Sequence, residues 1–135
     1  MSTTLGSVEL LLAVKNKLKE HTEMAVYDTV PPDNAPSPLI FVEMTGSTLD
    51  HRKLVYKERY NFNIHHITAE NAPNATIYEV LDKIRAWLEE EVALPDYATL
   101  IQQITTGIQV VKKEETDEWH GIIGFDLVVA YYLSK

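Results

Sequence analysis

The chain has 135 residues, a formal net charge of −8 and no cysteine. Its length and its 45% hydrophobic content are those of one soluble globular domain, so we treat residues 1–135 as a single domain. The lack of cysteine excludes disulfides, thiol nucleophiles and thiolate metal sites. The excess of acidic residues argues against tight, sequence-independent nucleic-acid binding, which relies on Lys and Arg.

The first part of the chain predicts a helix and two strands separated by a stiff loop. A helix is expected from Val8 to about Glu20, with apolar residues on one broad side, lysines in the last turn and Ser7 as the N-cap. A short strand around 24–27 follows, and four of the six prolines then lie within residues 31–38. Because proline fixes φ and lacks an N–H, this segment connects the short strand to a strand over 39–48.

The middle of the chain contains the clearest strand and a second helix. From Leu54 to Ile67, apolar residues at even positions alternate with polar ones, which indicates a long strand with one buried face. A helix with a narrow apolar stripe is expected over about 75–92, with Asn74 or Thr76 as its cap. The acidic run at 89–91 lies at the unfavourable pole of the helix dipole, so it is expected to face solvent or a partner.

Two more strands complete the pattern. One is expected within 97–113, and the other, over 119–133, again alternates apolar and polar residues after a charged turn at 114–118. Candidate core positions in the first of these strands are Ile104, Ile108 and Val110. The order α-β-β-β-α-β-β predicts an α+β fold, with a mixed or antiparallel sheet of about five strands and two helices packed on one face. The longest apolar runs are far shorter than the roughly 20 residues of a membrane span, and no secretory leader is recognisable.

Motifs for chemistry are absent from the sequence. His65 and His66 are adjacent on a predicted strand, so their side chains point to opposite faces and do not share a metal ion. His21, His51 and His120 are distant in sequence, which leaves convergence in the folded chain open. Nucleophile-elbow, phosphate-loop and dinucleotide-binding motifs are missing. We therefore predict no catalytic residue, no cofactor and no metal site.

The order of elements, together with Tyr27, Asp28, Val30 and Pro31 before the loop and Pro38 before the next strand, resembles the small tail-completion and tail-terminator (head–tail joining) proteins of long-tailed bacteriophages and prophages. The resemblance covers nearly the whole chain. It implies a structural protein, without a cofactor, that forms a ring, usually a hexamer, at the head-proximal end of the tail.

The resemblance also implies the partners and the location. Such a ring ends polymerisation of the tail-tube protein and faces the head-connector proteins, while genomic DNA passes through its lumen. No membrane partner is expected. The expected location is the head–tail junction of the virion, and the host cytoplasm during assembly. An acidic chain suits a lumen that does not trap DNA.

Long strands in a small domain are expected to carry turns that project from the core. We predict that two turns of opposite charge form the assembly interface, namely Asp50, His51, Arg52 and Lys53, and Glu114, Glu115, Asp117, Glu118 and Trp119. Two alternatives stay open at this point. One is a small metal- or ligand-binding α+β enzyme built around His65, His66 or His120, and the other is an adaptor that binds one partner without forming a ring.

Overall fold

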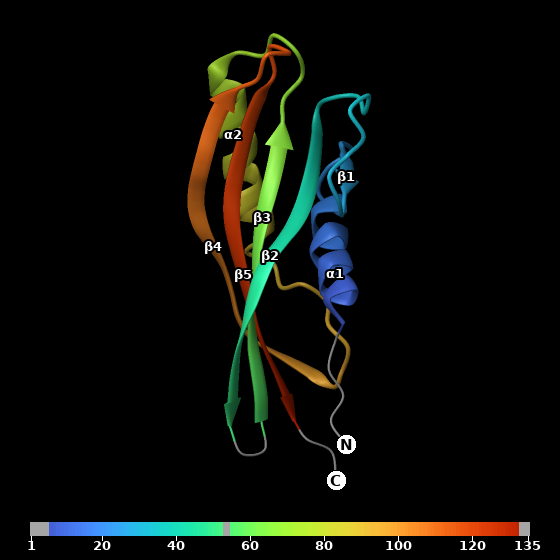
Figure 1. Cartoon of the computed structure of the whole chain (residues 1–135), viewed down its shortest axis with the longest axis vertical. Coiled ribbons are helices and arrows are strands. Elements are labelled where there is room, and N and C mark those ends of the chain that lie inside the picture. The colour runs from blue at the N-terminus through green and yellow to red at the C-terminus, as the bar shows by residue number, and fades with distance from the viewer. Residues whose placement is uncertain (1–5, 53–54, 133–135) are drawn as a thin grey trace.

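The computed structural model describes residues 6–52 and 55–132. The elements follow one another in the predicted order: α1 (Ser7–Lys19), β1 (Ala25–Tyr27), β2 (Leu39–Arg52), β3 (Val55–Ile67), α2 (Asn74–Trp87), β4 (Ala98–Lys113) and β5 (Trp119–Tyr132). Both helices lie on the same side of one long, twisted sheet (Figure 1). The α+β fold predicted from the sequence is confirmed.

The five strands form a mixed sheet in the order β1-β2-β3-β5-β4. β1 pairs with β2 in parallel, and the three other pairs are antiparallel. β4 is therefore one edge of the sheet and the short β1 is the other. The helix α1 packs on β1 and β2, whereas α2 packs on β3, β4 and β5. Within residues 6–52 and 55–132, no helix lies on the opposite side, which is called the open face below (Figure 1).

The core lies between the sheet and the two helices, and it follows the predicted alternation. Tyr60, Phe62 and Ile64 on β3 are buried, as predicted from the even positions of that strand. The predicted core residues of β5, Ile123, Phe125, Leu127, Val129 and Tyr131, are buried, and Val128 and Ala130 between them are buried as well. A Cβ built on Gly121 comes within 2.8 to 2.9 Å of the side chains of Leu81 and Ile77. Glycine at this position therefore allows α2 to approach β5 closely.

The ends of the helices differ from the prediction. The N-cap of α1 is Gly6, whose N–H donates to Glu9 Oε1 at 3.3 Å, and not Ser7, which is the first helical residue. The N-cap of α2 is Pro73, without a side-chain capping bond, so the predicted caps are wrong. The helix α2 also ends at Trp87, earlier than the sequence pattern indicated.

The three candidate core positions in β4 are wrong. Ile104, Ile108 and Val110 are 45%, 39% and 40% exposed. The reason is the place of β4 at the edge of the sheet, together with shifts of its register against β5 at three places. These shifts turn side chains away from a regular alternation.

None of the helices in the described part of the chain is long and apolar enough to cross a membrane.

Candidate functional site

A groove lies on the open face, at the end of the sheet that carries the turn between β4 and β5. Its volume is about 550 Å³. The proline-rich connection between β1 and β2 forms one wall with Val30, Pro31, Pro32, Asp33 and Ala35, and the β4–β5 turn forms another with Glu114, Glu115, Thr116 and Glu118. Leu39, Phe41, Ile67 and His120 complete the lining. The stiff proline segment therefore supplies a wall of a groove between strands.

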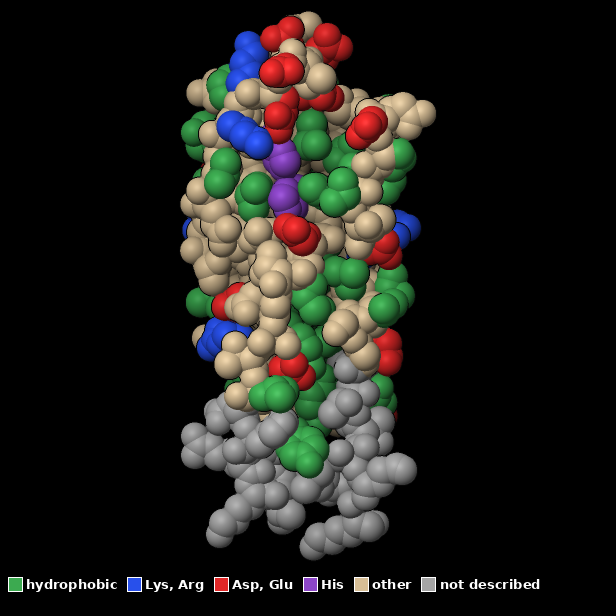
Figure 2. All heavy atoms as spheres, viewed as in Figure 1, with side chains coloured by type: hydrophobic (Ala, Val, Ile, Leu, Met, Phe, Trp, Pro, Cys, Tyr) green, Lys and Arg blue, Asp and Glu red, His purple; other side chains and the backbone are tan. Residues whose placement is uncertain are grey.

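A chain of four polar side chains crosses the sheet beside this groove. Glu43 Oε1 lies 2.9 Å from His65 Nε2, and His65 Nδ1 lies 2.8 Å from His120 Nε2. His120 Nδ1 lies 2.9 Å from Glu114 Oε1. Glu43, His65 and His120 come from β2, β3 and β5, so the chain links three strands and the β4–β5 turn. On this face, Figure 2 shows histidine side chains with acidic side chains above and below them.

The aromatic ring of Phe41 covers part of this chain. It stacks on His65 with ring centroids 4.0 Å apart and an angle of 21° between the planes. Phe41 and His65 are only 6% and 8% exposed. Burial lowers the pKa of His65, while its bond with Glu43 opposes that change. The bond from His120 lowers the pKa of Glu114, so this carboxyl is ionised at neutral pH.

The acidic turn between β4 and β5 has a defined conformation. Glu114 N–H donates to Glu118 O at 2.8 Å, and Asp117 adopts a positive φ of 62°. Lys113 Nζ lies 3.7 Å from Asp117 Oδ1. Glu115 is exposed at the tip. The predicted assembly residues of this turn thus lie together at one end of the sheet.

The second turn predicted as an assembly interface, residues 50–53, begins at the other end of the sheet. Asp50, His51 and Arg52 end β2, where the structure describes their backbone only, and Lys53 lies outside the described residues. β3 runs the full length between the two ends, which separates them by about 40 Å at about 3.3 Å per residue. The two turns therefore do not meet within one chain.

Trp119 lies at the start of β5 and is partly buried against the core. Its indole Nε1–H donates to Ala72 O at 3.1 Å, and Lys113 Nζ lies 5.9 Å from the ring centroid. The side chain thus holds the segment before α2 against the sheet. Its part in an assembly interface stays a prediction.

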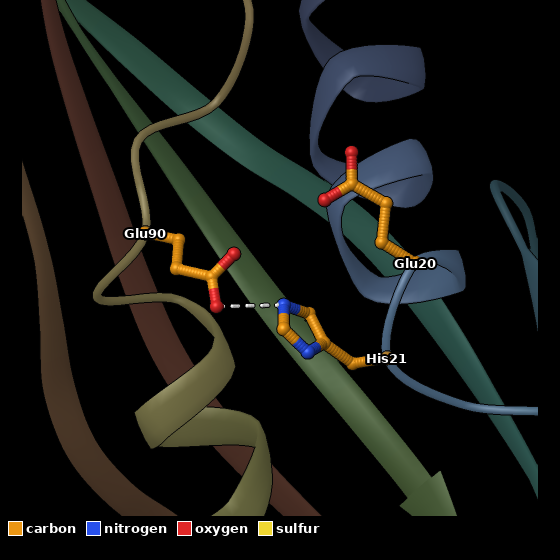
Figure 3. A group of neighbouring side chains, drawn as sticks. All are labelled: Glu20, His21 and Glu90. Carbon is orange, nitrogen blue, oxygen red and sulfur yellow. Dashed lines mark ion pairs between the residues drawn. The ribbon is translucent and has the colours of Figure 1, made fainter.

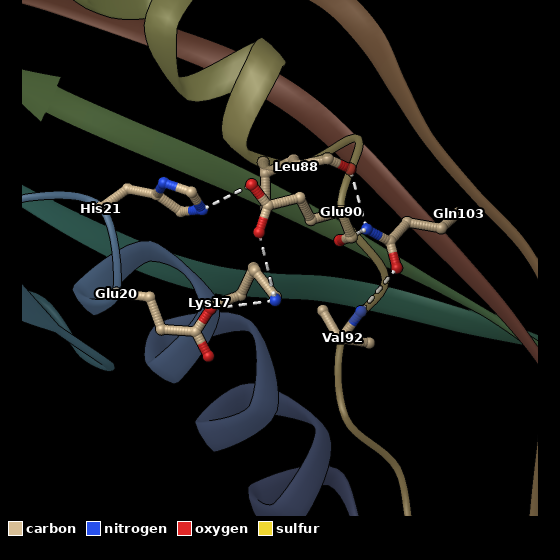
Figure 4. Close-up of polar contacts among 7 residues, drawn as sticks. All are labelled: Lys17, Glu20, His21, Leu88, Glu90, Val92 and Gln103. Atoms are coloured by element: carbon tan, nitrogen blue, oxygen red, sulfur yellow. Dashed lines mark hydrogen bonds and ion pairs between the residues drawn. The ribbon is translucent and has the colours of Figure 1, made fainter.

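A second cluster joins the carboxyl ends of α1 and α2 on the helix side. Ligand atoms of Glu20, His21 and Glu90 lie within 4.8 Å of one another, a spacing that suits a metal ion (Figure 3). Lys17 Nζ, however, lies 3.0 Å from Glu20 Oε2 and 3.6 Å from Glu90 Oε1, and His21 Nε2 lies 3.0 Å from Glu90 Oε2 (Figure 4). The hydrogen bond with Glu20 raises the pKa of Lys17. Lys17 therefore already pairs with both carboxylates, and Glu90 links the two helices.

Gln103 of β4 explains the early end of α2. Its Nε2 donates to Leu88 O at 2.8 Å and to Glu90 O at 2.6 Å, and its Oε1 accepts from Val92 N at 3.0 Å (Figure 4). One side chain thus binds three backbone groups that a longer helix would have paired internally. The cluster of Figure 4 is therefore a structural junction rather than a reactive site.

Comparison with known proteins identifies the family. Residues 1–135, the whole chain, match the model of a phage tail terminator family described as "Putative tail termination protein". The chain belongs to this family. It is accordingly a structural protein of a phage tail, and the resemblance seen in the sequence is confirmed.

A solved structure has the same fold. A chain of the structure entitled "Virion of native gene transfer agent (GTA) particle" superimposes with a TM-score of 0.70 at 20% sequence identity. The match covers 90% of the tail protein described here and 94% of that chain. No curated protein sequence matches this one.

The pairing of His65 with His120 is the feature that sequence reasoning missed. The alternation of β3 and β5 places both residues on the open face, so the sequence was sufficient to assign the face of the sheet. The sequence did not show the register between the two strands, which pairs Ile67 with His120 and His65 with Ile122. The two histidines are therefore diagonal neighbours across adjacent strands.

Proposed function

We propose that this protein forms a ring, usually a hexamer, at the head-proximal end of a phage tail, where it ends polymerisation of the tail tube and joins the tail to the head. The match of residues 1–135 to the tail termination family carries this proposal. The role is structural and non-catalytic, and it requires no cofactor. Its partners are other copies of the chain, the tail-tube protein and the head-connector proteins, and genomic DNA passes through the lumen. Its place is the head–tail junction, with assembly in the host cytoplasm.

The surface of the subunit supports self-association in a ring. Residues 98–111 of the edge strand β4 carry no charge, and their exposed apolar side chains are Ile101, Ile104, Ile108 and Val110. The other edge of the sheet is flanked by α1, on which Val8 and Leu12 are 68% and 38% exposed. Apolar patches on opposite edges suit a head-to-tail contact, and such contacts form a ring when the rotation between neighbouring copies closes.

The acidic turn supports contacts of a different kind. Glu114, Glu115, Asp117 and Glu118 lie at one end of the sheet, and the segment with Arg52 begins at the other. Because one chain cannot bring these ends together, we propose that each meets a group of opposite charge on a neighbouring protein. Such rim charges determine partner choice and the rate of association more than affinity.

The β4 edge is tested with an Ile101→Lys, Ile104→Lys double variant, which places two charges on the apolar patch. Tyr78→Lys on α2, at a position with 43% exposure, is the matched control. Each variant is mixed with purified tail tubes, and capped tubes are counted by electron microscopy. If the β4 edge forms the contact between copies in the ring, the double variant leaves tubes uncapped and overlong, while the control variant caps them. Normal capping by the double variant would rule out this edge as the contact.

The acidic turn is tested separately with Glu115→Gln combined with Asp117→Asn. Asparagine tolerates the positive φ of Asp117, so the turn keeps its conformation. We expect a folded subunit with slower tail joining, and a smaller effect of salt on the joining rate than in the wild type. Joining at the wild-type rate at every salt concentration would contradict a role for this turn.

A further inference from the structure

Two imidazole rings from neighbouring strands face each other on the open face. His65 Nδ1 and His120 Nε2 are 2.8 Å apart, and the ring centroids are 5.1 Å apart. Both side chains are largely buried, with 10% and 13% of their side-chain surface exposed. Their mutual position is fixed by the register of β3 and β5 and by the stacking of Phe41 on His65.

The outer nitrogen of each ring is committed to a carboxylate. An ionised carboxylate only accepts hydrogen bonds, so His65 Nε2 and His120 Nδ1 each carry a proton, donated to Glu43 and Glu114. A neutral imidazole has one N–H, which leaves a lone pair on each of the two inner nitrogens. Two lone pairs at hydrogen-bonding distance repel each other. The three contacts among Glu43, His65, His120 and Glu114 need three N–H protons, whereas two neutral histidines supply only two.

We propose that His65 Nδ1 and His120 Nε2 form a binding site for one cation, namely a proton in the absence of metal and a first-row divalent metal ion such as Zn²⁺ in its presence. Both occupants share one chemistry, because each accepts the two facing lone pairs. This inference does not depend on ring formation and goes beyond the proposed role in the tail.

The surroundings favour a positive charge at this position. Glu43 approaches from β2 and Glu114 from the β4–β5 turn, and Lys112 of β4 lies 3.7 Å from Glu114. Two carboxylates thus outnumber one ammonium. An additional proton lies between His65 Nδ1 and His120 Nε2, where one ring donates it and the other accepts it.

The same arrangement offers two nitrogen ligands to a metal ion. Histidines that bind metals commonly donate their other ring N–H to a carboxylate, as both histidines do here. Two nitrogens on tetrahedral zinc, each at about 2.0 to 2.1 Å, are about 3.3 Å apart. The rings would therefore have to separate by about 0.5 Å from the present 2.8 Å. His120 also lines the groove, which gives water access to the remaining coordination positions.

Proton binding by the histidine pair is tested by NMR of ¹⁵N-labelled histidine side chains in the full chain, with EDTA present. We expect the pair to take up one proton in a step that shifts the signals of both rings together, and a second proton only at much lower pH. His66→Asn, beside the pair but outside it, is expected to keep this behaviour. In His120→Gln the joint step disappears, and His65 titrates as a single ring.

Metal binding by the histidine pair is tested by equilibrium dialysis against Zn²⁺ after removal of EDTA. We expect one Zn²⁺ per chain, with binding weakened about tenfold or more in His120→Gln. Because the metal displaces one proton, binding should also weaken by about tenfold for each unit that the pH falls below the joint step. His21→Gln, which removes the histidine of the cluster with Glu20 and Glu90, is the matched control and should bind Zn²⁺ as the wild type does.

The two measurements together identify the occupant. A joint proton step without zinc binding assigns the site to a proton alone, and stoichiometric zinc lost in His120→Gln assigns it to both. If the two rings titrate independently, and zinc binding is absent or unaffected by His120→Gln, the proposal is wrong.

Discussion

Acid should destabilise this protein through His66, which lies in the core on the helix side of β3. The side chain is 1% exposed, and its Nδ1–H donates to Leu39 O at 2.9 Å. A proton on the other ring nitrogen would place a charge in the core. Burial therefore lowers the pKa of His66 to about 4. In the unfolded chain the pKa of histidine returns to about 6.5.

The sign and size of the effect follow from proton linkage. Above pH 6.5 the ring is neutral in both states, so the free energy of unfolding does not depend on this group. Below that pH the unfolded state binds a proton that the folded state does not, and stability falls by about 1.4 kcal/mol per pH unit. The loss from His66 reaches about 2 kcal/mol at pH 5 and about 3 kcal/mol at pH 4, where the folded state also begins to bind the proton.

Urea unfolding, followed by tryptophan fluorescence at pH 7.5 and pH 5.0, measures this loss. His66→Asn keeps an N–H donor for Leu39 O and removes the titration. We expect the free energy of unfolding of the variant to fall by about 2 kcal/mol less than that of the wild type between the two pH values. The comparison of differences cancels contributions shared by the two proteins, whatever the absolute stability of the variant. Equal losses in both would refute the reasoning.

Two further substitutions test packing and the end of α2. Gly121→Ala should lower the free energy of unfolding by about 1 to 3 kcal/mol, because the new Cβ lies within 3.0 Å of α2 side chains. Gly46→Ala, in open space, is its control, and a similar loss in both would contradict close packing as the cause. Gln103→Ala should lower it by about 1 to 3 kcal/mol, because Leu88 O and Val92 N lose their partner. Hydrogen exchange at residues 88–92 should accelerate in this variant, and an unchanged exchange rate would argue against the proposed junction.

Local patterns were sufficient for the elements and for most of the core. The alternation in 54–67 predicted the buried Tyr60, Phe62 and Ile64, because a strand repeats its facing every two residues. The prolines of 31–38 predicted a connection rather than a strand, since they lack N–H donors. The same segment gave part of the resemblance to the phage tail family that comparison then confirmed.

Tertiary structure decided where each strand lies and what its side chains meet. Period two assigns a residue to a face of the sheet, but it does not name the neighbouring strand. Ile104 is therefore exposed, because β4 is an edge, although its sequence resembles that of a core strand. The end of α2 was likewise set by Gln103, which is distant in sequence.

The histidine pair shows this division most clearly. The sequence by itself placed His65 and His120 on predicted strands and indicated that His65 and His66 do not share a metal ion. Only the pairing of β3 with β5 brought the two rings to 2.8 Å, and only the pairing of β2 with β3 added Glu43. Such contacts depend on long-range register, which is fixed by the packing of the whole sheet rather than by any local run of residues.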